Sequence, residues 1–329
     1  PGPDVLSLLA DELSAGVAAS TLPDLPFRGG WVGFIGYECA ALTLPGLSPT
    51  HARAHPDAYF IRPQSFIVYD HHTETAHLCC LAGDGAEDLL ARLEAALGAK
   101  EPGPTGEDGG ASLSAGSWRS PGYLERIKRA QEFLHAGESY EVCLTDTYTA
   151  AAEGELYPQL RSHNPAPYAA HLVFDGVEVC STSPERFLTV RGREVEAKPI
   201  KGTISADQDP TLLTTDPKTR AENLMIVDLL RNDLSRVCEP GSVRVPKLMQ
   251  VESYATVHQL VSTITGALRA NATAVDALRA TFPPGSMTGA PKLRTCEILD
   301  QLETGPRGVY SGVVGYLGFD GQADLSVVI

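Results

Sequence analysis

The chain lacks any apolar run long enough to cross a membrane. A transmembrane helix needs about 20 consecutive apolar residues, and no stretch of the 329 residues approaches that length. The first residues also lack the basic start and apolar centre of a signal peptide. Hydrophobic residues still make up 43% of the sequence, which is ample for a core, so we expect a soluble protein with no membrane partner.

Basic residues are too few to balance the acidic ones. The sequence has 26 Lys and Arg residues against 41 Asp and Glu residues, which gives a net charge of −15. A field of this sign repels phosphates, so we expect no nucleic-acid partner. An anionic substrate would need local cations or a metal ion to hold it.

The seven cysteines show neither pairing nor zinc-ligand spacing. Their number is odd, and they are scattered over positions 39, 79, 80, 143, 180, 238 and 296. Such cysteines are typical of reduced thiols, which persist in a reducing compartment. We therefore expect a cytoplasmic location.

Composition divides the chain into three parts. Residues 99–121 are rich in Gly, Pro, Ser, Glu and Asp, which predicts a flexible linker or surface excursion between residues 1–98 and residues 122–329. Periodicity predicts helices over 5–19, 85–97, 123–136, 218–237 and 291–302, and strands over 31–38, 59–69, 76–81, 139–150, 168–182, 257–264, 308–319 and 323–329. Many strands joined by hairpins, with long helices outside them, predict an α+β fold with mostly antiparallel sheets.

A predicted hairpin over residues 183–203 carries the first candidate site residue, Lys201. Strand alternation places Lys201 on the more apolar side of its run, and Pro199 marks a strand end or edge. Gly202 allows another backbone or a ligand to approach closely. A partly desolvated lysine favours the neutral amine and is a nucleophile. The alternative is a surface lysine at a strand end.

The helix predicted over 218–237 carries the second candidate, Glu222. Its apolar stripe is too wide for a surface helix, so we expect most of it to be buried. No cation lies three or four residues after Glu222, which makes Mg²⁺ a natural partner because this ion prefers hard oxygen ligands. The alternative is a carboxylate favoured by the helix dipole. We expect Asp228 and Arg231 to pair with each other.

Two further segments offer candidates with structural alternatives. His258 lies in the strand predicted over 257–264, where a lone histidine is usually a satisfied core residue. Gly289 and Ser286 lie in a turn before the last long helix. Backbone N–H groups at such a helix start can hold an anion, and Lys292 adds charge, although many glycine turns simply start helices.

Five segments in one order resemble the chorismate-utilising enzymes. They are residues 184–187 (PERF), 199–203 (PIKGT), 220–233 (RAENLMIVDLLRND), 257–262 (VHQLVS) and 285–292 (GSMTGAPK). The resemblance extends back to Phe27 and covers nearly the whole chain. It implies a large sandwich of two mostly antiparallel sheets wrapped by helices, with the site between the sheets.

The resemblance also implies a reaction. Lys201 would attack carbon C2 of chorismate while Glu185, as general acid, protonates the departing C4 hydroxyl; ammonia then adds at C4 and gives 4-amino-4-deoxychorismate, the precursor of p-aminobenzoate. Anthranilate synthase component I is similar but carries alanine at the position of Lys201, so it is the disfavoured alternative. A non-catalytic paralogue that binds chorismate is another alternative.

The resemblance implies the remaining site residues and partners as well. His258 would be the active-site histidine, Glu222 a ligand of Mg²⁺, and the substrate contacts would be Thr203, Ser286, Gly289, Tyr310 and Gly312. A glutamine amidotransferase, as a separate subunit or a fused domain, would supply ammonia. The family's second Mg²⁺ glutamate and its substrate-clamping arginine follow a segment that matches residues 308–329. We therefore expect this chain, which also lacks an initial methionine, to be part of a longer protein.

Overall fold

The computed structural model describes residues 4–16, 25–52, 55–98, 111–118 and 121–329. Most of the predicted linker, residues 99–121, lies outside these described residues. Its described part contains two short strands, β5 (Ser112–Leu113) and β6 (Ser117–Trp118). Within the described ranges, no helix is both long and apolar enough to cross a membrane.

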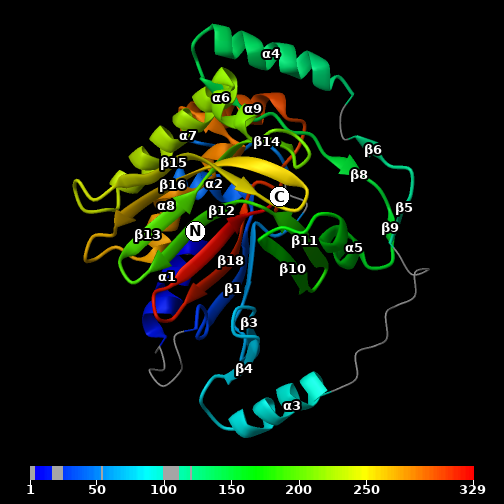
Figure 1. Cartoon of the computed structure of the whole chain (residues 1–329), viewed down its shortest axis with the longest axis vertical. Coiled ribbons are helices and arrows are strands. Elements are labelled where there is room, and N and C mark those ends of the chain that lie inside the picture. The colour runs from blue at the N-terminus through cyan, green and yellow to red at the C-terminus, as the bar shows by residue number, and fades with distance from the viewer. Residues whose placement is uncertain (1–3, 17–24, 53–54, 99–110, 119–120) are drawn as a thin grey trace.

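One nine-stranded sheet organises the molecule (Figure 1). Its order is β14-β16-β13-β12-β19-β18-β1-β2, with β15 paired to β16, and every pair is antiparallel. The strands are β1 (Gly30–Ile35), β2 (Ala58–Ile61), β12 (Arg186–Arg191), β13 (Glu194–Lys198), β14 (Ile200–Ser205), β15 (Arg244–Ser253), β16 (Val257–Ala267), β18 (Val313–Gly318) and β19 (Ala323–Val327). Because β1 pairs with β18, the described parts of the chain before and after the predicted linker both contribute strands to this sheet.

A smaller layer covers one face of this sheet. The β10 (Tyr168–Phe174) and β11 (Val177–Ser183) hairpin packs there against Phe34 and Val314. Four other two-stranded sheets surround the large one. They are formed by β3 (Ser65–Asp70) with β4 (Thr75–Cys80), β7 (Glu141–Val142) with β17 (Gly289–Ala290), β5 with β9 (Ala152–Glu153), and β6 with β8 (Tyr148–Thr149).

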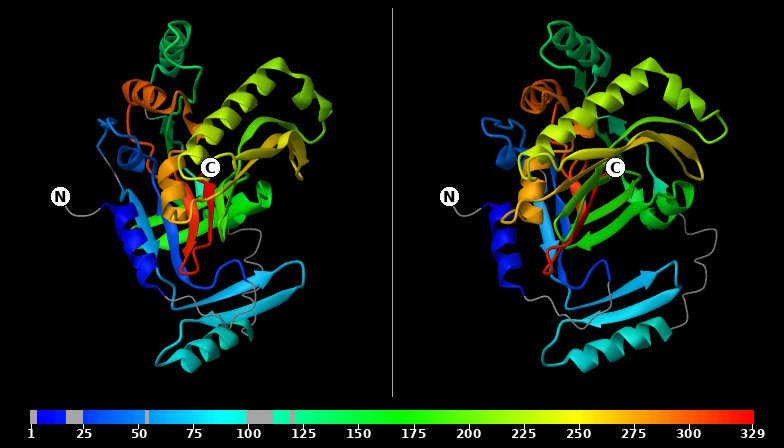
Figure 2. Two further views of the ribbon diagram at one scale, coloured as in Figure 1. Left: turned by 90° about the vertical axis from the view of Figure 1, so that its left-hand side faces the viewer. Right: turned by 60° about the vertical axis from the view of Figure 1, so that its left-hand side comes forward.

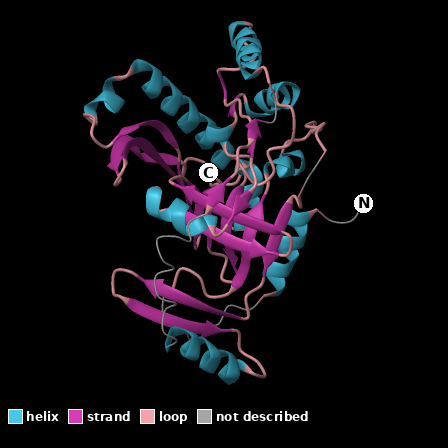
Figure 3. Ribbon diagram, turned by 90° about the vertical axis from the view of Figure 1, so that its right-hand side faces the viewer, coloured by secondary structure: helices cyan, strands magenta, loops and turns pink. Residues whose placement is uncertain are grey.

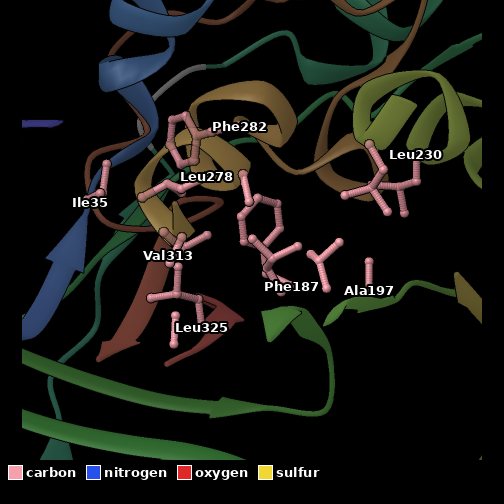
Figure 4. Packing of buried hydrophobic residues seen from close by; sticks show 14 of the residues in the cluster. Ile35, Phe187, Ala197, Leu230, Leu278, Phe282, Val313 and Leu325 are labelled. Carbon is pink, nitrogen blue, oxygen red and sulfur yellow. The ribbon is translucent and has the colours of Figure 1, made fainter. Parts of the chain in front are cut away.

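Helices cover the other face and enclose the main core. In Figure 2, α1 (Val5–Ala15), α7 (Pro217–Ser235) and α8 (Ala274–Thr281) lie along the large sheet. Figure 4 shows Phe187 of β12 and Leu278 of α8 within this core. The remaining helices are η1 (Tyr37–Cys39), α2 (Ala40–Thr43), α3 (Ala86–Gly98), α4 (Tyr123–His135), α5 (Leu156–His163), α6 (Thr211–Thr215), η2 (Gly285–Met287) and α9 (Lys292–Leu302).

The α+β fold predicted from the sequence is confirmed. Antiparallel strands form the centre and helices lie outside them, as Figure 3 shows. The hairpin over 183–203 is also confirmed, with Gly192 in the left-handed region at its turn (φ +60°). Its second run divides at Pro199 into β13 and β14, because proline cannot donate a ladder hydrogen bond.

Several predicted elements were wrong in extent. The strand predicted over 139–150 consists of two short strands, and the strand predicted over 59–69 divides between the large sheet and the β3–β4 pair. The sequence reading missed β15 and α8. The helix α7 is less buried than expected, since Leu224 and Asp228 are exposed on its outer side. The width of the apolar stripe in the sequence therefore led to an overestimate of how much of α7 is buried.

Candidate active site

Lys201 lies in a β-bulge of the large sheet. The β14–β16 register shifts by one residue between Ile200 and Thr203, so Lys201 and Gly202 form the bulge. Gly202 has φ +97°, and a Cβ there would lie 2.2 Å from Cγ2 of Thr219 in α7. The Lys201 side chain is 14% exposed. The predicted partial burial of this lysine is therefore confirmed.

The Lys201 amine is held by two acceptors. It donates to Glu141 Oε1 at 2.5 Å and to the Ser286 carbonyl at 3.0 Å. Burial lowers the pKa of Lys201, but the charge of Glu141 and its hydrogen bond outweigh burial, so the pKa lies above its usual value. The expectation of a neutral amine is thus wrong for this state of the protein, because the sequence reading did not foresee Glu141.

Glu185 is buried at the junction of β11 and β12. Its Oε1 accepts a hydrogen bond from Ser286 Oγ at 2.6 Å, and its backbone carbonyl accepts one from Val327 of β19 at 3.1 Å. Burial raises the pKa of Glu185 to about 7, although the Ser286 hydrogen bond and the Lys201 charge oppose the shift. A carboxyl group with this pKa can act as a proton donor near neutral pH.

The short helix η2 joins the amine and the acid. Ser286 contacts Glu185 through its hydroxyl and Lys201 through its carbonyl. Buried Arg307 fixes this helix, since its guanidinium donates to the Met287 carbonyl at 2.6 Å. The sequence analysis missed Arg307 and Glu141, and the only local signal for Glu141 was a charged residue inside a predicted strand.

Gly289 brings Glu141 to this site through the β7–β17 pair. It has φ +138°, and a Cβ there would lie 1.9 Å from the Glu141 carbonyl oxygen.

We expect Gly289→Ala to push β7 away, to lower turnover and to destabilise the fold by more than about 2 kcal/mol in urea unfolding. Gly241→Ala is the control, because Gly241 has φ +76° but nothing within 4 Å of its Cβ position. Equal losses in both variants would contradict the close-approach explanation.

Comparison with known proteins places this geometry in a family. The profile described as chorismate binding enzyme matches residues 5–329. The chain belongs to this family. It is 47% identical to the aminodeoxychorismate synthase of Streptomyces griseus, over 94% of this chain and 45% of that protein. It is 38% identical to aminodeoxychorismate synthase component 1 of Klebsiella aerogenes, over 99% of this chain and 74% of that protein.

A solved structure agrees with the family assignment. Anthranilate synthase component I from Streptococcus pneumoniae TIGR4 has a TM-score of 0.89 and 32% identity to this chain, and the match covers 99% of this chain and 77% of that one. The chain spans about half the length of two curated relatives, 45% of the Streptomyces griseus protein and 48% of the Streptomyces pristinaespiralis aminodeoxychorismate synthase.

In this chorismate binding enzyme, Glu222 is accessible on α7. Its side chain is 33% exposed, and its Oε1 lies 3.6 Å from Nζ of Lys218, which is 83% exposed. No cation follows Glu222 at the third or fourth position, as expected, but Lys218 four residues earlier was not considered and lies beside it. The predicted pair of Asp228 and Arg231 is confirmed at 3.2 Å. Glu222 also lies close enough to Glu141 for its charge to raise the pKa of Glu141.

His258 and Thr203 lie further along the β14–β16 pair. The His258 ring nitrogens contact Ser253 Oγ at 2.8 Å and the Ala206 carbonyl at 3.1 Å, rather than Lys201 or Glu185. Thr203 is paired with Gln259, the neighbour of His258, so alternation places it on the opposite sheet face from His258. Their predicted roles stay predictions.

The other predicted substrate contacts surround the Arg307 segment. Tyr310 is 42% exposed and lines a cleft of about 450 Å³ together with Arg307. Gly312 allows the chain to pass close to β1, since a Cβ there would lie 2.2 Å from the Ile35 carbonyl oxygen. Binding by Tyr310 and Gly312 stays a prediction.

The expected contribution of Lys292 to an anion site was wrong, because its buried amine pairs with Asp233 at 2.6 Å.

Proposed function

We propose that the full-length protein converts chorismate and ammonia into 4-amino-4-deoxychorismate. The observation that carries this proposal is the buried Lys201 amine joined through Ser286 to Glu185, a carboxyl group with a pKa of about 7. Relatives named aminodeoxychorismate synthase, at 38 to 47% identity, support the same activity.

The proposed reaction proceeds in two displacements. The neutral Lys201 amine forms a bond to C2, both ring double bonds shift, and the C4–O bond breaks as Glu185 donates its proton, so that the hydroxyl leaves as water. Ammonia then forms a bond to C4, both double bonds shift back, and the C2–N bond breaks to release the lysine amine. The enolpyruvyl group stays on the ring throughout. Glu185 recovers a proton from the product ammonium or from solvent.

A magnesium ion fits the donor chemistry of Glu222. The carboxylate is accessible, and its partner Lys218 is a mostly exposed side chain that a divalent cation can displace. Glu222 would hold the ion together with residues outside this chain or with water. When bound, Mg²⁺ would neutralise a carboxylate of the substrate, which this acidic protein otherwise repels.

The proposed Mg²⁺ site predicts that the Glu222→Gln variant binds Mg²⁺ more weakly. The amide removes one negative charge from the proposed ligand, so we expect the Mg²⁺ concentration for half-maximal activity to rise at least about tenfold. Asp228→Asn on the same helix is the control, because Asp228 is exposed and pairs with Arg231. A magnesium titration of turnover measures both variants. An unchanged midpoint in Glu222→Gln would remove this residue from the metal site.

The proposed ammonia source is a glutamine amidotransferase, either a separate subunit or a fused domain, and the proposed pathway is p-aminobenzoate and folate synthesis. A cytoplasmic location is part of the proposal. It is supported by the seven cysteines, all in the described part of the chain, none of which forms a disulfide.

Product identification tests the proposed function. The full-length protein is incubated with chorismate, Mg²⁺ and an ammonium salt, and the products are separated by chromatography and identified by mass. We expect 4-amino-4-deoxychorismate to accumulate. Accumulation of anthranilate would instead assign anthranilate synthase activity, and no consumption of chorismate would favour a non-catalytic binding protein. Turnover with glutamine alone would indicate a fused amidotransferase.

A further inference from the structure

Glu141 uses only one of its two carboxylate oxygens. Its Oε1 accepts from the Lys201 amine at 2.5 Å. Its Oε2 is buried and has no hydrogen-bond partner among the described residues. A buried carboxylate oxygen without a partner disfavours the charged form of the group. The Glu141 side chain is therefore suited to receiving a proton.

Burial of this pair favours the same conclusion. Glu222 and Lys218 face Glu141 from α7, while Cys143 and Glu185 lie on the Lys201 side. Burial is the largest influence on the pKa of Glu141 and raises it above its usual value, although the charges of Lys201 and Lys218 act in the opposite direction. In water a lysine and a glutamate differ in pKa by about six. Desolvation acts to narrow this gap from both sides, while the ion pair between the two groups acts to widen it.

We propose that Glu141 is the proton acceptor that converts the Lys201 ammonium into a nucleophilic amine. This inference rests on the proposed function, in which Lys201 attacks the substrate. One proton moves from Nζ to the Glu141 carboxylate, the N–H electron pair stays on nitrogen, and the net charge of the pair does not change. Rotation about the Cε–Nζ bond then turns the lone pair toward the ring. After the amine is released, Glu141 returns the proton.

The position of Ser286 makes the transfer productive. Its carbonyl accepts a second N–H of Lys201 at 3.0 Å, so the nitrogen stays in place when the proton leaves toward Glu141. Glu141 therefore needs no movement of the backbone to act. Solvent would otherwise have to remove the proton from an amine that is mostly buried.

The test is the rate of adduct formation on Lys201. Full-length protein is mixed with chorismate and Mg²⁺ without ammonia, and the covalent adduct is followed by intact-protein mass from pH 6 to pH 9. We expect Glu141→Gln to slow adduct formation about 100-fold at pH 7. The ratio of its rate to the wild-type rate should rise about tenfold per pH unit, because hydroxide replaces the missing base. Taking the ratio cancels the titration of Glu185.

Two variants complete the design. Glu141→Asp keeps a carboxylate and should be slowed less than Glu141→Gln at pH 7. Glu138→Gln is the matched control, because Glu138 lies in the same segment and pairs with Arg294 at the surface. Its rate should stay within about twofold of wild type.

Three results would overturn the inference. The first is a Glu141→Gln rate equal to or above wild type at pH 7, which would mean that burial alone frees the amine. The second is a slow rate whose ratio to wild type does not change with pH, which would indicate a purely structural role. The third is a Glu141→Asp rate no better than that of the amide. Wild-type turnover without any adduct would instead contradict the proposed function itself.

Discussion

Replacing Lys201 with alanine should lower the formation of 4-amino-4-deoxychorismate at least about 1,000-fold. The variant has no amine to attack C2, so the covalent step of the proposed reaction is lost altogether. Chromatographic measurement of turnover with chorismate, Mg²⁺ and ammonium checks this prediction. Intact-protein mass should show no adduct at any pH.

The control for this variant lies three residues earlier. Lys198 pairs with Glu252 at 2.8 Å, and its alanine variant should keep turnover within about twofold of wild type. Removing Lys201 also leaves the buried Glu141 carboxyl group without its partner, and breaking a buried pair in this way typically costs about 3–5 kcal/mol. Thermal unfolding must therefore show that the Lys201→Ala protein is folded at the assay temperature. Full activity of the folded variant would refute the lysine mechanism.

Replacing Glu185 with glutamine should lower turnover about 100- to 10,000-fold. The amide keeps the shape of the side chain and can still contact Ser286, but it cannot donate the proton that the C4 hydroxyl needs. The wild-type rate should fall as pH rises through about 7, because only the protonated carboxyl group is an acid. The residual rate of Glu185→Gln should not show that fall. A wild-type profile that is retained in the amide variant would assign the titration to another group.

The raised pKa of Glu185 also predicts that the stability of the folded protein depends on pH. The folded protein binds the Glu185 proton more tightly than the unfolded chain, so stability falls as pH rises from about 4.5 to about 7. The full penalty, roughly 3 kcal/mol from a pKa of about 7 against 4.5, persists above that range. Glutamine removes this dependence. Urea unfolding at pH 5 and pH 8 should show a smaller difference for Glu185→Gln than for wild type.

Local sequence was sufficient for the hairpin that presents Lys201. A turn glycine between two strand-like runs predicted both strands, and burial of Val195 and Ala197 confirms which side of the second run faces inward. These features depend on neighbours within about 20 residues. Pro199 likewise marked the division between β13 and β14 before any long-range contact was known.

The partners of Lys201 could not be predicted in the same way. Glu141 lies 60 residues earlier and Ser286 lies 85 residues later in the chain. Glu141 belongs to a two-residue strand, which is too short to produce a periodic signal. Alternation correctly predicted burial of the lysine, but the direction of its pKa shift depends on a charge that only the fold brings close.

The placement of Ser286 limits how this protein can be altered. One residue sets the environment of two reactive groups through different atoms, its hydroxyl for Glu185 and its carbonyl for Lys201. A substitution that displaces η2 would change acid strength and nucleophile orientation together. Laboratory selection for a new substrate should therefore leave η2 unchanged and accumulate substitutions elsewhere around the site.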